Sequence, residues 1–264
     1  AGRRGEIVLA SRGGMSVKGG QRVIVGRPVT LRSHVDASLR RLQVDHIDLY
    51  YLHRWDRAVP IGDSVAALAE MVDAGKIGAI GLSEVSVARL RDARRAAPIA
   101  AVQNEYSLWT RNAELGMLEE TRERGIAFVA FSPVARGFLS DSIHDPQLLP
   151  PKDIRRTMPR FQPGNWAINA ALLPSWRSLA REAGCTPAQL ALAWLLSRGE
   201  HVVPIPGTTD AGHLRDDIAV TDLTIDAELL TRAGELVGTA TVAGARYAPG
   251  PAAAVDTETF EVSP

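Results

Sequence analysis

One stretch joins a helical pattern to a buried strand and decides the fold: Asp36-Ala-Ser-Leu-Arg-Arg-Leu-Gln-Val-Asp-His-Ile-Asp-Leu-Tyr-Tyr-Leu-His53. Apolar residues such as Leu31, Val35 and Leu39 recur at helical spacing. The run at 46–52 is short, apolar and rich in residue types that favour strands. The stretch therefore predicts a helix followed by a buried strand that ends at His53.

The same alternation extends in both directions. Six short apolar runs are separated by helical patterns, at 6–10, 46–52, 76–82, 98–102, 125–131 and 201–205. Thr186-Pro187-Ala188-Gln189 predicts a further helix start, with a hydroxyl N-cap, proline at the first helical position and a glutamine that closes a capping box. Alternating strands and helices imply right-handed βαβ units and a parallel sheet, either open or closed into a barrel.

An open dinucleotide-binding sheet needs a glycine-rich phosphate fingerprint after a strand, and Gly13-Gly14 and Gly19-Gly20 lack its spacing. The α/β fold is therefore expected to be a (β/α)8 barrel. Such a barrel has eight strands, whereas six are counted after a start of Ala1-Gly2-Arg3-Arg4. We expect an N-terminally incomplete barrel, with about six of eight βα units present.

The domain prediction is a single partial barrel over residues 1–264. Within it, 136–164 is a long stretch between two strands, and loops of that length at the strand ends usually cover a site. The segment 239–264, rich in Ala, Gly and Pro, is expected to be an extended tail.

Composition limits the partners. Thirty basic residues balance 30 acidic ones, which leaves no field to attract nucleic acid or a membrane surface, and a small molecule fits better. Cys185 is the single cysteine, which excludes an internal disulfide and a multi-cysteine metal site and favours a reducing compartment. No apolar run reaches the roughly 18 residues of a membrane span. The chain is expected to be cytoplasmic and soluble.

Residues just past the strands are neighbours in a parallel barrel, and they are Arg12, His53, Ser83, Gln103, Phe131 and Gly207. An imidazole at a strand end can hydrogen-bond a carbonyl oxygen or move a proton near neutral pH. Hydroxyl and amide groups suit a carboxamide, and a phenyl ring suits a flat aromatic ring. Each residue alone is equally compatible with packing. Trp55, Trp109 and Phe161 either pack or line an aromatic pocket.

The opening stretch closely resembles the aldo-keto reductases, whose catalytic histidine closes the same string. The likeness continues in family order through Gly81-Leu-Ser-Glu-Val-Ser86, Gln103-Asn-Glu-Tyr-Ser-Leu-Trp109, Phe131-Ser-Pro-Val-Ala-Arg-Gly-Phe-Leu139, Thr186-Pro-Ala-Gln-Leu-Ala-Leu-Ala-Trp-Leu-Leu196 and Val203-Pro-Ile-Pro-Gly-Thr208. It covers nearly the whole chain. It implies the (β/α)8 fold and reduction of an aldehyde or ketone by NADPH, with NADH possible.

The resemblance also implies site residues. The catalytic positions are His53 and Arg12, the latter standing at the place of the family's lysine. The nicotinamide carboxamide and ring are assigned to Ser83, Gln103 and Phe131, and the pyrophosphate to the segment 132–137, with Ser132, Val134, Arg136 and Gly137. The adenosine end is assigned to Gly207, Thr208, Thr209, His213, Asp216 and Asp217. No metal is expected.

The match departs from the family at four places. The family's proton-donating tyrosine and its helper aspartate belong to a segment upstream of Ala1. Arg12 replaces a compact lysine ammonium with a bulkier guanidinium. Thr209 stands where many relatives carry an arginine or lysine for the 2'-phosphate. Asp216 and Asp217 stand where relatives place glutamate and asparagine.

Three readings follow from this. The chain is a carbonyl reductase, impaired as it stands. Alternatively, it is a non-catalytic binding or regulatory protein on the same fold. In the third reading it is a fragment whose unpaired sheet edges, such as Ile7-Val8-Leu9, lead to self-association.

Overall fold

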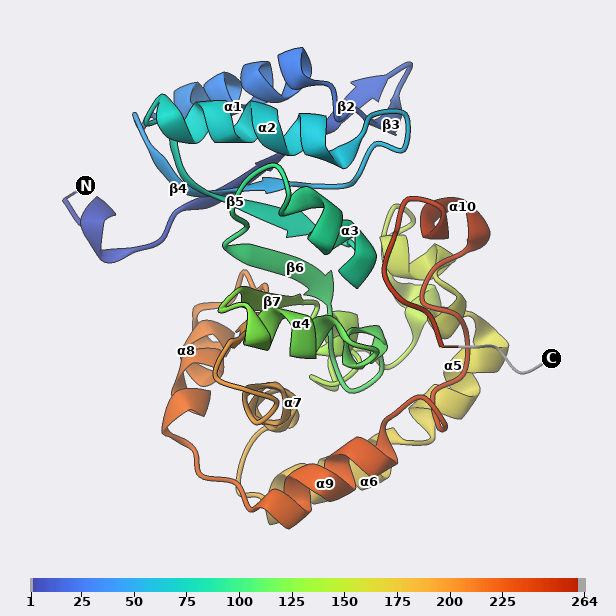
Figure 1. Cartoon of the computed structure of the whole chain (residues 1–264). Coiled ribbons are helices and arrows are strands. Elements are labelled where there is room, and N and C mark those ends of the chain that lie inside the picture. The colour runs from blue at the N-terminus through green and yellow to red at the C-terminus, as the bar shows by residue number, and fades with distance from the viewer. Residues whose placement is uncertain (1, 261–264) are drawn as a thin grey trace. The chain divides into compact units, whose positions relative to one another are not determined.

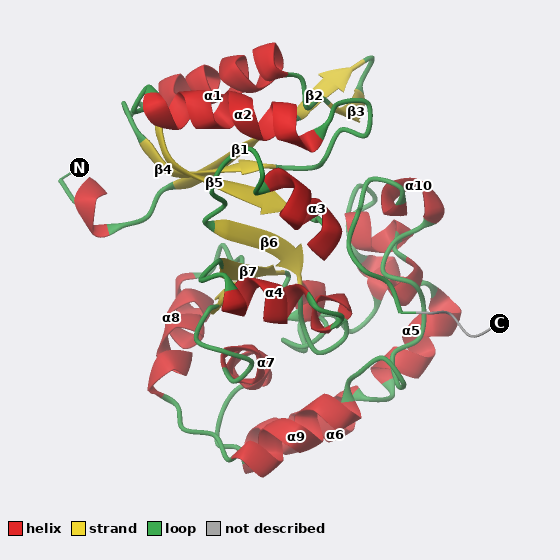
Figure 2. Ribbon diagram, viewed as in Figure 1, coloured by secondary structure: helices red, strands yellow, loops and turns green. Residues whose placement is uncertain are grey.

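The computed structural model describes residues 2–260 and is an α/β structure built on a sheet (Figures 1 and 2). The sheet has six strands in the order β1-β4-β5-β6-β7-β8. Their bounds are Ala10–Gly13, Ile47–Leu52, Ile77–Ser83, Ala101–Glu105, Ala127–Phe131 and Val202–Ile205. The six strands correspond to the six apolar runs of the sequence. Closure into an eight-stranded barrel stays a prediction.

The first four strands of the sheet are parallel and in register. The aligned pairs include Gly13 with Leu52, Leu52 with Leu82, and Ser83 with Gln103. Because parallel neighbours need a crossover connection, a helix lies between each consecutive pair along the chain. These helices are α1 (Pro28–Leu42), α2 (Ile61–Asp73) and α3 (Val87–Ala93). The carboxyl ends of the four strands therefore lie along one edge.

The described residues form two compact units. Unit 1 comprises 2–104, 116–128 and 254–259, and unit 2 comprises 105–115, 129–253 and 260. In unit 1, the buried face of α1, with Leu31 and Val35, and that of α2, with Val65 and Leu68, belong to the same core as Tyr50 of β4. Unit 1 also contains α4 (Met117–Glu123). The expectation of a single barrel domain stays a prediction.

Unit 2 holds most of the remaining helices, which are α5 (Pro163–Ala170), α6 (Leu173–Glu182), α7 (Pro187–Leu196), α8 (Ala211–Ala219), α9 (Ala227–Leu236) and α10 (Pro249–Ala252). The predicted capping box of α7 is confirmed, since the Thr186 side chain accepts from the Gln189 N–H and Gln189 accepts from the Thr186 N–H. Because α10 lies within 239–264, the described part of this tail is not extended throughout.

Two predicted strands are displaced by a few residues. Strand β1 begins at Ala10, whereas Arg4–Glu6 forms a 3-10 helix and Ile7 and Val8 are exposed. The Leu9 N–H donates to the Asp48 carboxylate at 2.7 Å and not to the neighbouring strand, while the Leu9 carbonyl accepts from the Leu49 N–H at 3.2 Å, so the ladder with β4 begins at the Leu9 carbonyl. Strand β6 begins at Ala101 and not at Pro98, which has no N–H to give to the sheet.

A hairpin between β1 and α1 was missed from the sequence. Strands β2 (Met15–Lys18) and β3 (Gln21–Ile24) pair antiparallel. They are joined by Gly19 and Gly20, both with positive φ, at 57° and 78°. Two glycines between apolar-polar runs are a recognised hairpin signal, because glycine adopts a positive φ at both turn positions without steric strain. Gly19 and Gly20 were considered only as part of a phosphate-binding fingerprint, so the hairpin was not predicted.

The stretch 136–164 is not a structureless loop. It contains short 3-10 helices at Pro146–Leu148, Ile154–Thr157 and Pro159–Phe161. Trp109 and Phe161 are buried, with 2% and 0% of their surface exposed, so they pack in the core of unit 2. That this stretch covers a site stays a prediction.

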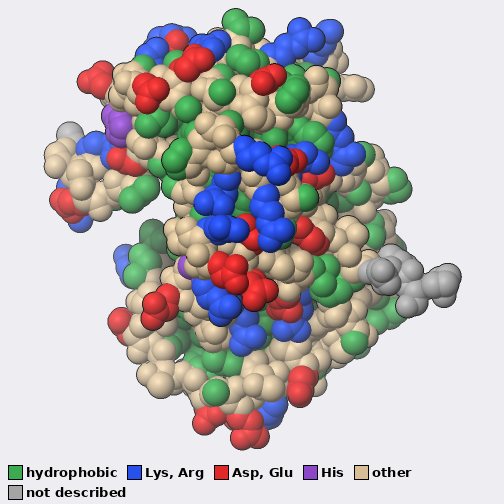
Figure 3. Space-filling model, viewed as in Figure 1, with side chains coloured by type: hydrophobic (Ala, Val, Ile, Leu, Met, Phe, Trp, Pro, Cys, Tyr) green, Lys and Arg blue, Asp and Glu red, His purple; other side chains and the backbone are tan. Residues whose placement is uncertain are grey.

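Charged side chains of both signs are interspersed over the visible face of the molecule (Figure 3). On unit 1, for example, Arg91 of α3 and Arg124 lie 2.6 Å and 3.0 Å from Glu120 of α4. Within residues 2–260, every helix falls short of the length and apolar character needed to cross a membrane.

Candidate active site

Four of the predicted site residues lie at the strand-end edge of unit 1. His53 follows β4 directly, and its backbone N–H donates to the Gly13 carbonyl of β1 at 2.9 Å. Arg12 lies on β1, one residue before Gly13. Ser83 ends β5 and is in register with Gln103 of β6. The parallel sheet therefore brings the two predicted catalytic residues and the two predicted carboxamide ligands to one edge.

The half-buried His53 is surrounded by positive charge. Burial, aided by three nearby arginines, lowers the pKa of His53 to about 4. The arginines are Arg54, Arg12 and Arg22. At neutral pH the ring is therefore uncharged, with one nitrogen that donates a hydrogen bond and one that accepts. Such a ring orients a carbonyl oxygen well but carries no proton to release.

Arg54 is a further residue of this edge, and the sequence reasoning missed it. Its Nη1 donates to the His53 carbonyl at 2.6 Å and to the Ser83 hydroxyl oxygen at 3.1 Å. A serine hydroxyl that accepts from arginine still has its own proton to donate. Ser83 is thus fixed as a donor toward an acceptor such as an amide oxygen. The only sequence signal for Arg54 was its place next to His53.

Gln103 is also held in place. Its side chain is hydrogen-bonded to the phenol of Tyr51, whose pKa is raised by burial. Tyr51 is 3% exposed. An amide has two donors and a carbonyl acceptor, so one contact leaves further groups of Gln103 for a ligand.

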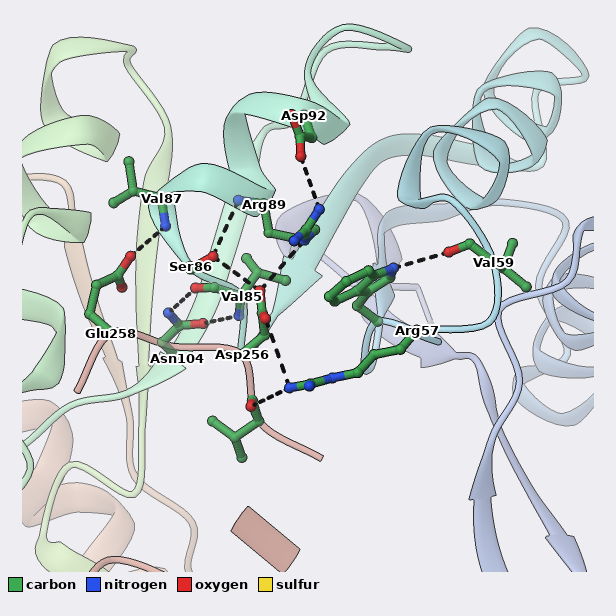
Figure 4. Close-up of polar contacts among 12 residues, drawn as sticks. Arg57, Val59, Val85, Ser86, Val87, Arg89, Asp92, Asn104, Asp256 and Glu258 are labelled. Atoms are coloured by element: carbon green, nitrogen blue, oxygen red, sulfur yellow. Dashed lines mark hydrogen bonds and ion pairs between the residues drawn. The ribbon is translucent and has the colours of Figure 1, made fainter. Parts of the chain in front are cut away.

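The loop after Ser83 is locked on both sides (Figure 4). The Asn104 amide accepts from the Val85 N–H at 3.3 Å and donates to the Val85 carbonyl at 3.0 Å. On the other side, the Ser86 hydroxyl donates to Asp256 at 3.0 Å, and the Val87 N–H donates to Glu258 at 2.6 Å. The tail segment 254–259 therefore fixes the connection between β5 and α3 within unit 1.

The predicted pyrophosphate residues form a contorted loop of unit 2 directly after β7. Three non-glycine residues have left-handed backbones: Ser132 (φ 53°), Ala135 (φ 52°) and Arg136 (φ 57°). Gly137 follows with φ 94°. Each non-glycine residue in this region costs about 1–2 kcal/mol. Tertiary contacts must compensate this strain. Strained backbone conformations of this kind are typical of ligand-binding loops.

Phe131, at the end of β7, is half-buried, and the guanidinium of Arg246 lies 5.7 Å from the centre of its ring. The Arg136 side chain is turned inward, where its Nη2 lies 2.7 Å from both a Glu105 carboxylate oxygen and the Tyr247 hydroxyl. Arg136 was predicted to lie at the pyrophosphate, and neither of these two partners was predicted. They lie 31 and 111 residues away along the chain, and no local pattern indicates them.

The predicted adenosine residues lie on an exposed loop and the first turns of α8 in unit 2. Gly207, Thr208 and Thr209 are exposed, and the Thr208 hydroxyl accepts from the Asp210 N–H at 3.0 Å. Asp210 caps α8 by accepting from the N–H groups of Gly212 and His213.

Farther along α8, Asp216 is exposed and Asp217 is half-buried. Burial raises the pKa of Asp217, opposed by the charge of His213 and reinforced by that of Asp216. The structure thus groups the predicted residues of unit 2 into two segments, 131–137 and 207–217. Among residues 2–260, no cluster of His, Cys, Asp and Glu is arranged to hold a metal ion.

The lowered pKa of His53 makes stability depend on pH. The folded pKa of about 4 lies below the ordinary histidine pKa of about 6.5, so the unfolded chain binds more protons between these values, and stability is lost as pH falls through this window. Between pH 7 and pH 5, we expect the free energy of unfolding of the wild type to fall by about 1 kcal/mol more than that of His53→Gln. This is less than the full pKa shift would give, because solvent screens the partly exposed His53 ring. Urea unfolding at both pH values measures this, and equal losses in the two proteins would contradict the shifted pKa.

Comparisons with known proteins agree on one family. A model described as the aldo/keto reductase family matches residues 1–237. The NADP(+) aldo-keto reductase yakc of Schizosaccharomyces pombe is 38% identical over 254 residues, covering 94% of this chain and 75% of the relative. Probable aldo-keto reductase 1 of Glycine max is 41% identical over 239 residues, covering 90% and 67%. The family match begins at residue 1, so it gives no support to the expectation of a missing N-terminal segment.

Solved structures give the same result. The glycerol dehydrogenase AKR11B4 from Gluconobacter oxydans superposes with a TM-score of 0.79 at 27% identity, covering 86% of this chain and 71% of that one. The holo form of aldo-keto reductase AKR11C1 from Bacillus halodurans gives a TM-score of 0.71 at 24% identity, covering 92% and 76%. The second likeness supports the fold alone.

Proposed function

This chain belongs to the aldo/keto reductase family, and we propose that its strand-end residues carry that family's reaction, the reduction of an aldehyde or ketone to an alcohol. The chain is an NADP-dependent oxidoreductase. The assignment of catalytic and carboxamide-binding roles rests on the residues that lie together at the strand-end edge of unit 1. There an uncharged His53 and the cation of Arg12 lie with Ser83 and Gln103. The non-catalytic alternative has no comparable support.

Within each unit, described by itself, residues suit individual groups of the cofactor. NADPH, when bound, supplies the hydride that reduces the carbonyl carbon. The Ser83 hydroxyl, held by Arg54, and the Gln103 amide are suited to a carboxamide. Phe131 is suited to a flat ring, and the left-handed loop 132–137 to a diphosphate. The exposed residues Thr209 and His213 are proposed to face the 2'-phosphate. Because Thr209 stands where many relatives carry an arginine or lysine, the preference for NADPH over NADH is expected to be weaker.

His53 and Arg12 are proposed to act on the substrate oxygen. The neutral imidazole donates a hydrogen bond that orients and polarises the carbonyl. The Arg12 guanidinium provides positive charge that stabilises the alkoxide formed as the carbon is reduced. Neither group supplies the final proton, because His53 is unprotonated at neutral pH and arginine does not titrate in the working range.

The four tyrosines of the chain are not placed to donate that proton. Tyr50, Tyr51 and Tyr106 are buried, and burial raises the pKa of each phenol. Tyr247 is hydrogen-bonded to Arg136. The role of proton donor is therefore assigned to none of these residues. The proton that completes the alcohol is proposed to come from water, and the activity is expected to be low.

The test is cofactor binding followed by turnover. We expect the fluorescence of NADPH to change when it is titrated into the purified chain. We also expect small aldehydes, tested as a panel, to increase the rate of NADPH oxidation. Thr209→Arg is expected to lower the Kd for NADPH about tenfold and leave that for NADH unchanged. One added charge-assisted contact to the 2'-phosphate is worth about 1.5–3 kcal/mol, and about 1.4 kcal/mol is tenfold.

Thr231→Arg is the matched control, because it adds the same charge at another exposed threonine of unit 2, on α9. Equal tightening by both variants would indicate a general charge effect. A wild-type chain that binds neither cofactor at millimolar concentration would exclude the function.

We also propose a cytoplasmic location, supported by the single cysteine and the balanced charge. Self-association through β1 is proposed on a different ground. Strand β1 ends the order of the sheet, and the adjacent Ile7 and Val8 are 57% and 75% exposed.

A further inference from the structure

Glu105, the last residue of β6, is a buried carboxylate in unit 2 with well-defined partners. Only 1% of its side chain is exposed. Its Oε2 lies 2.7 Å from Arg136 Nη2 and 3.0 Å from Arg246 Nε. Its Oε1 accepts from the Thr110 hydroxyl at 3.1 Å. A buried carboxylate is tolerated only with this kind of pairing.

Glu105 is ionised in the folded protein. Burial alone would raise the pKa of Glu105, but the charges of Arg246 and Arg136 outweigh it and hold the pKa below its usual value. Arg160 adds to this effect and donates to Thr110 at 2.7 Å. The carboxylate is therefore a fixed negative charge within a shell of arginines.

Arg136 connects this fixed charge to the loop 132–137. Its side chain is held by Glu105 and by the Tyr247 hydroxyl, both at 2.7 Å. Its own carbonyl accepts from Arg155 Nη1 at 3.1 Å, and Arg155 is paired with Asp153 at 2.7 Å. Arg136, which has a φ of 57° near the end of the strained loop, is thus anchored through both its side chain and its backbone.

We propose that Glu105 is a positioning residue for the diphosphate of the dinucleotide. It pairs with Arg136 and thereby holds the loop 132–137 in the left-handed conformation that receives the diphosphate. Arg136 then contributes through the backbone it stabilises, since its guanidinium is turned toward Glu105 and Tyr247. This inference rests on the proposed function, because it concerns the same cofactor.

Glu105→Gln tests it, because the amide keeps the shape of the side chain and removes its charge. The Kd values of NADPH and of 2'-phospho-ADP-ribose, which contains the diphosphate, are expected to rise about tenfold. The Kd of adenosine 2'-monophosphate, which lacks the diphosphate, is expected to stay within about twofold. Isothermal titration calorimetry measures all three. Glu114→Gln is the control, since Glu114 is another arginine-paired carboxylate of unit 2, 2.9 Å from Arg111.

Tyr247→Phe is a milder second variant, which serves if Glu105→Gln does not fold. It removes one partner of Arg136 and keeps the ring, and the two diphosphate ligands are expected to weaken about threefold. Equal weakening of adenosine 2'-monophosphate would indicate general destabilisation and overturn the proposal. Wild-type NADPH binding with unchanged variants would overturn this inference alone. Failure of the wild type to bind NADPH would overturn the proposed function and this inference together.

Discussion

His53→Gln is expected to lower kcat for aldehyde reduction by about 10²- to 10³-fold, while the Kd for NADPH stays within about twofold. A positioned donor that hydrogen-bonds the reacting oxygen typically contributes about this much to the rate. Glutamine retains a donor, but a flexible amide replaces a ring that the Gly13 carbonyl helps to fix through the His53 backbone. Steady-state NADPH oxidation and fluorescence titration separate the two effects.

His46→Gln is the matched control for this prediction. His46 immediately precedes β4 in the same unit, at the opposite end of that strand from His53, and its Nδ1 lies 2.8 Å from the Gly75 carbonyl oxygen. Its replacement is expected to leave kcat unchanged. If His53→Gln retained more than about a third of the wild-type kcat, the imidazole would not act on the substrate oxygen. A parallel loss of NADPH affinity would place His53 in cofactor binding.

The sequence predicted the strand centres and the strand-end residues but misplaced the boundaries. Apolar periodicity depends on burial, so β4 and β5 were found within a residue or two of their observed bounds. Where a strand starts depends on its partner's backbone and side chains, as the Asp48 contact to the Leu9 N–H shows. Such a contact joins residues 39 apart and leaves no local signal.

The residues of the candidate site were also predictable only in part. His53, Ser83 and Gln103 were predictable as neighbours, because parallel strands align their carboxyl ends. The groups that position them were not. Arg54 reaches Ser83 across 29 residues. The tail contact between Ser86 and Asp256 spans 170 residues. Long arginine and carboxylate side chains find partners only once the chain is folded, so residue type alone does not identify the pair.

An aromatic cluster in unit 2 carries the largest expected effect on stability. Trp109 stacks on Phe138 with ring centres 4.7 Å apart, and Phe161 meets Trp109 edge-on at 5.5 Å. Trp166 contacts both phenylalanines, at 5.9 Å and 5.8 Å. Because Phe138 directly follows the loop 132–137, the cluster also supports one end of that loop. Burial of three large rings makes the site intolerant of a cavity.

Trp109→Ala is expected to lower the free energy of unfolding by about 3–5 kcal/mol, the usual cost of deleting a buried large aromatic side chain. Trp109→Phe is the informative control, because it keeps a ring on Phe138 and removes an Nε1–H that is buried without a hydrogen-bond partner in the described part of the chain. Losing an unpaired donor offsets part of the lost contact, so we expect a cost below about 1.5 kcal/mol. Urea unfolding followed by circular dichroism measures both. Similar costs for the two variants would mean that the pyrrole edge, and not ring volume, stabilises the cluster, contrary to the packing seen here.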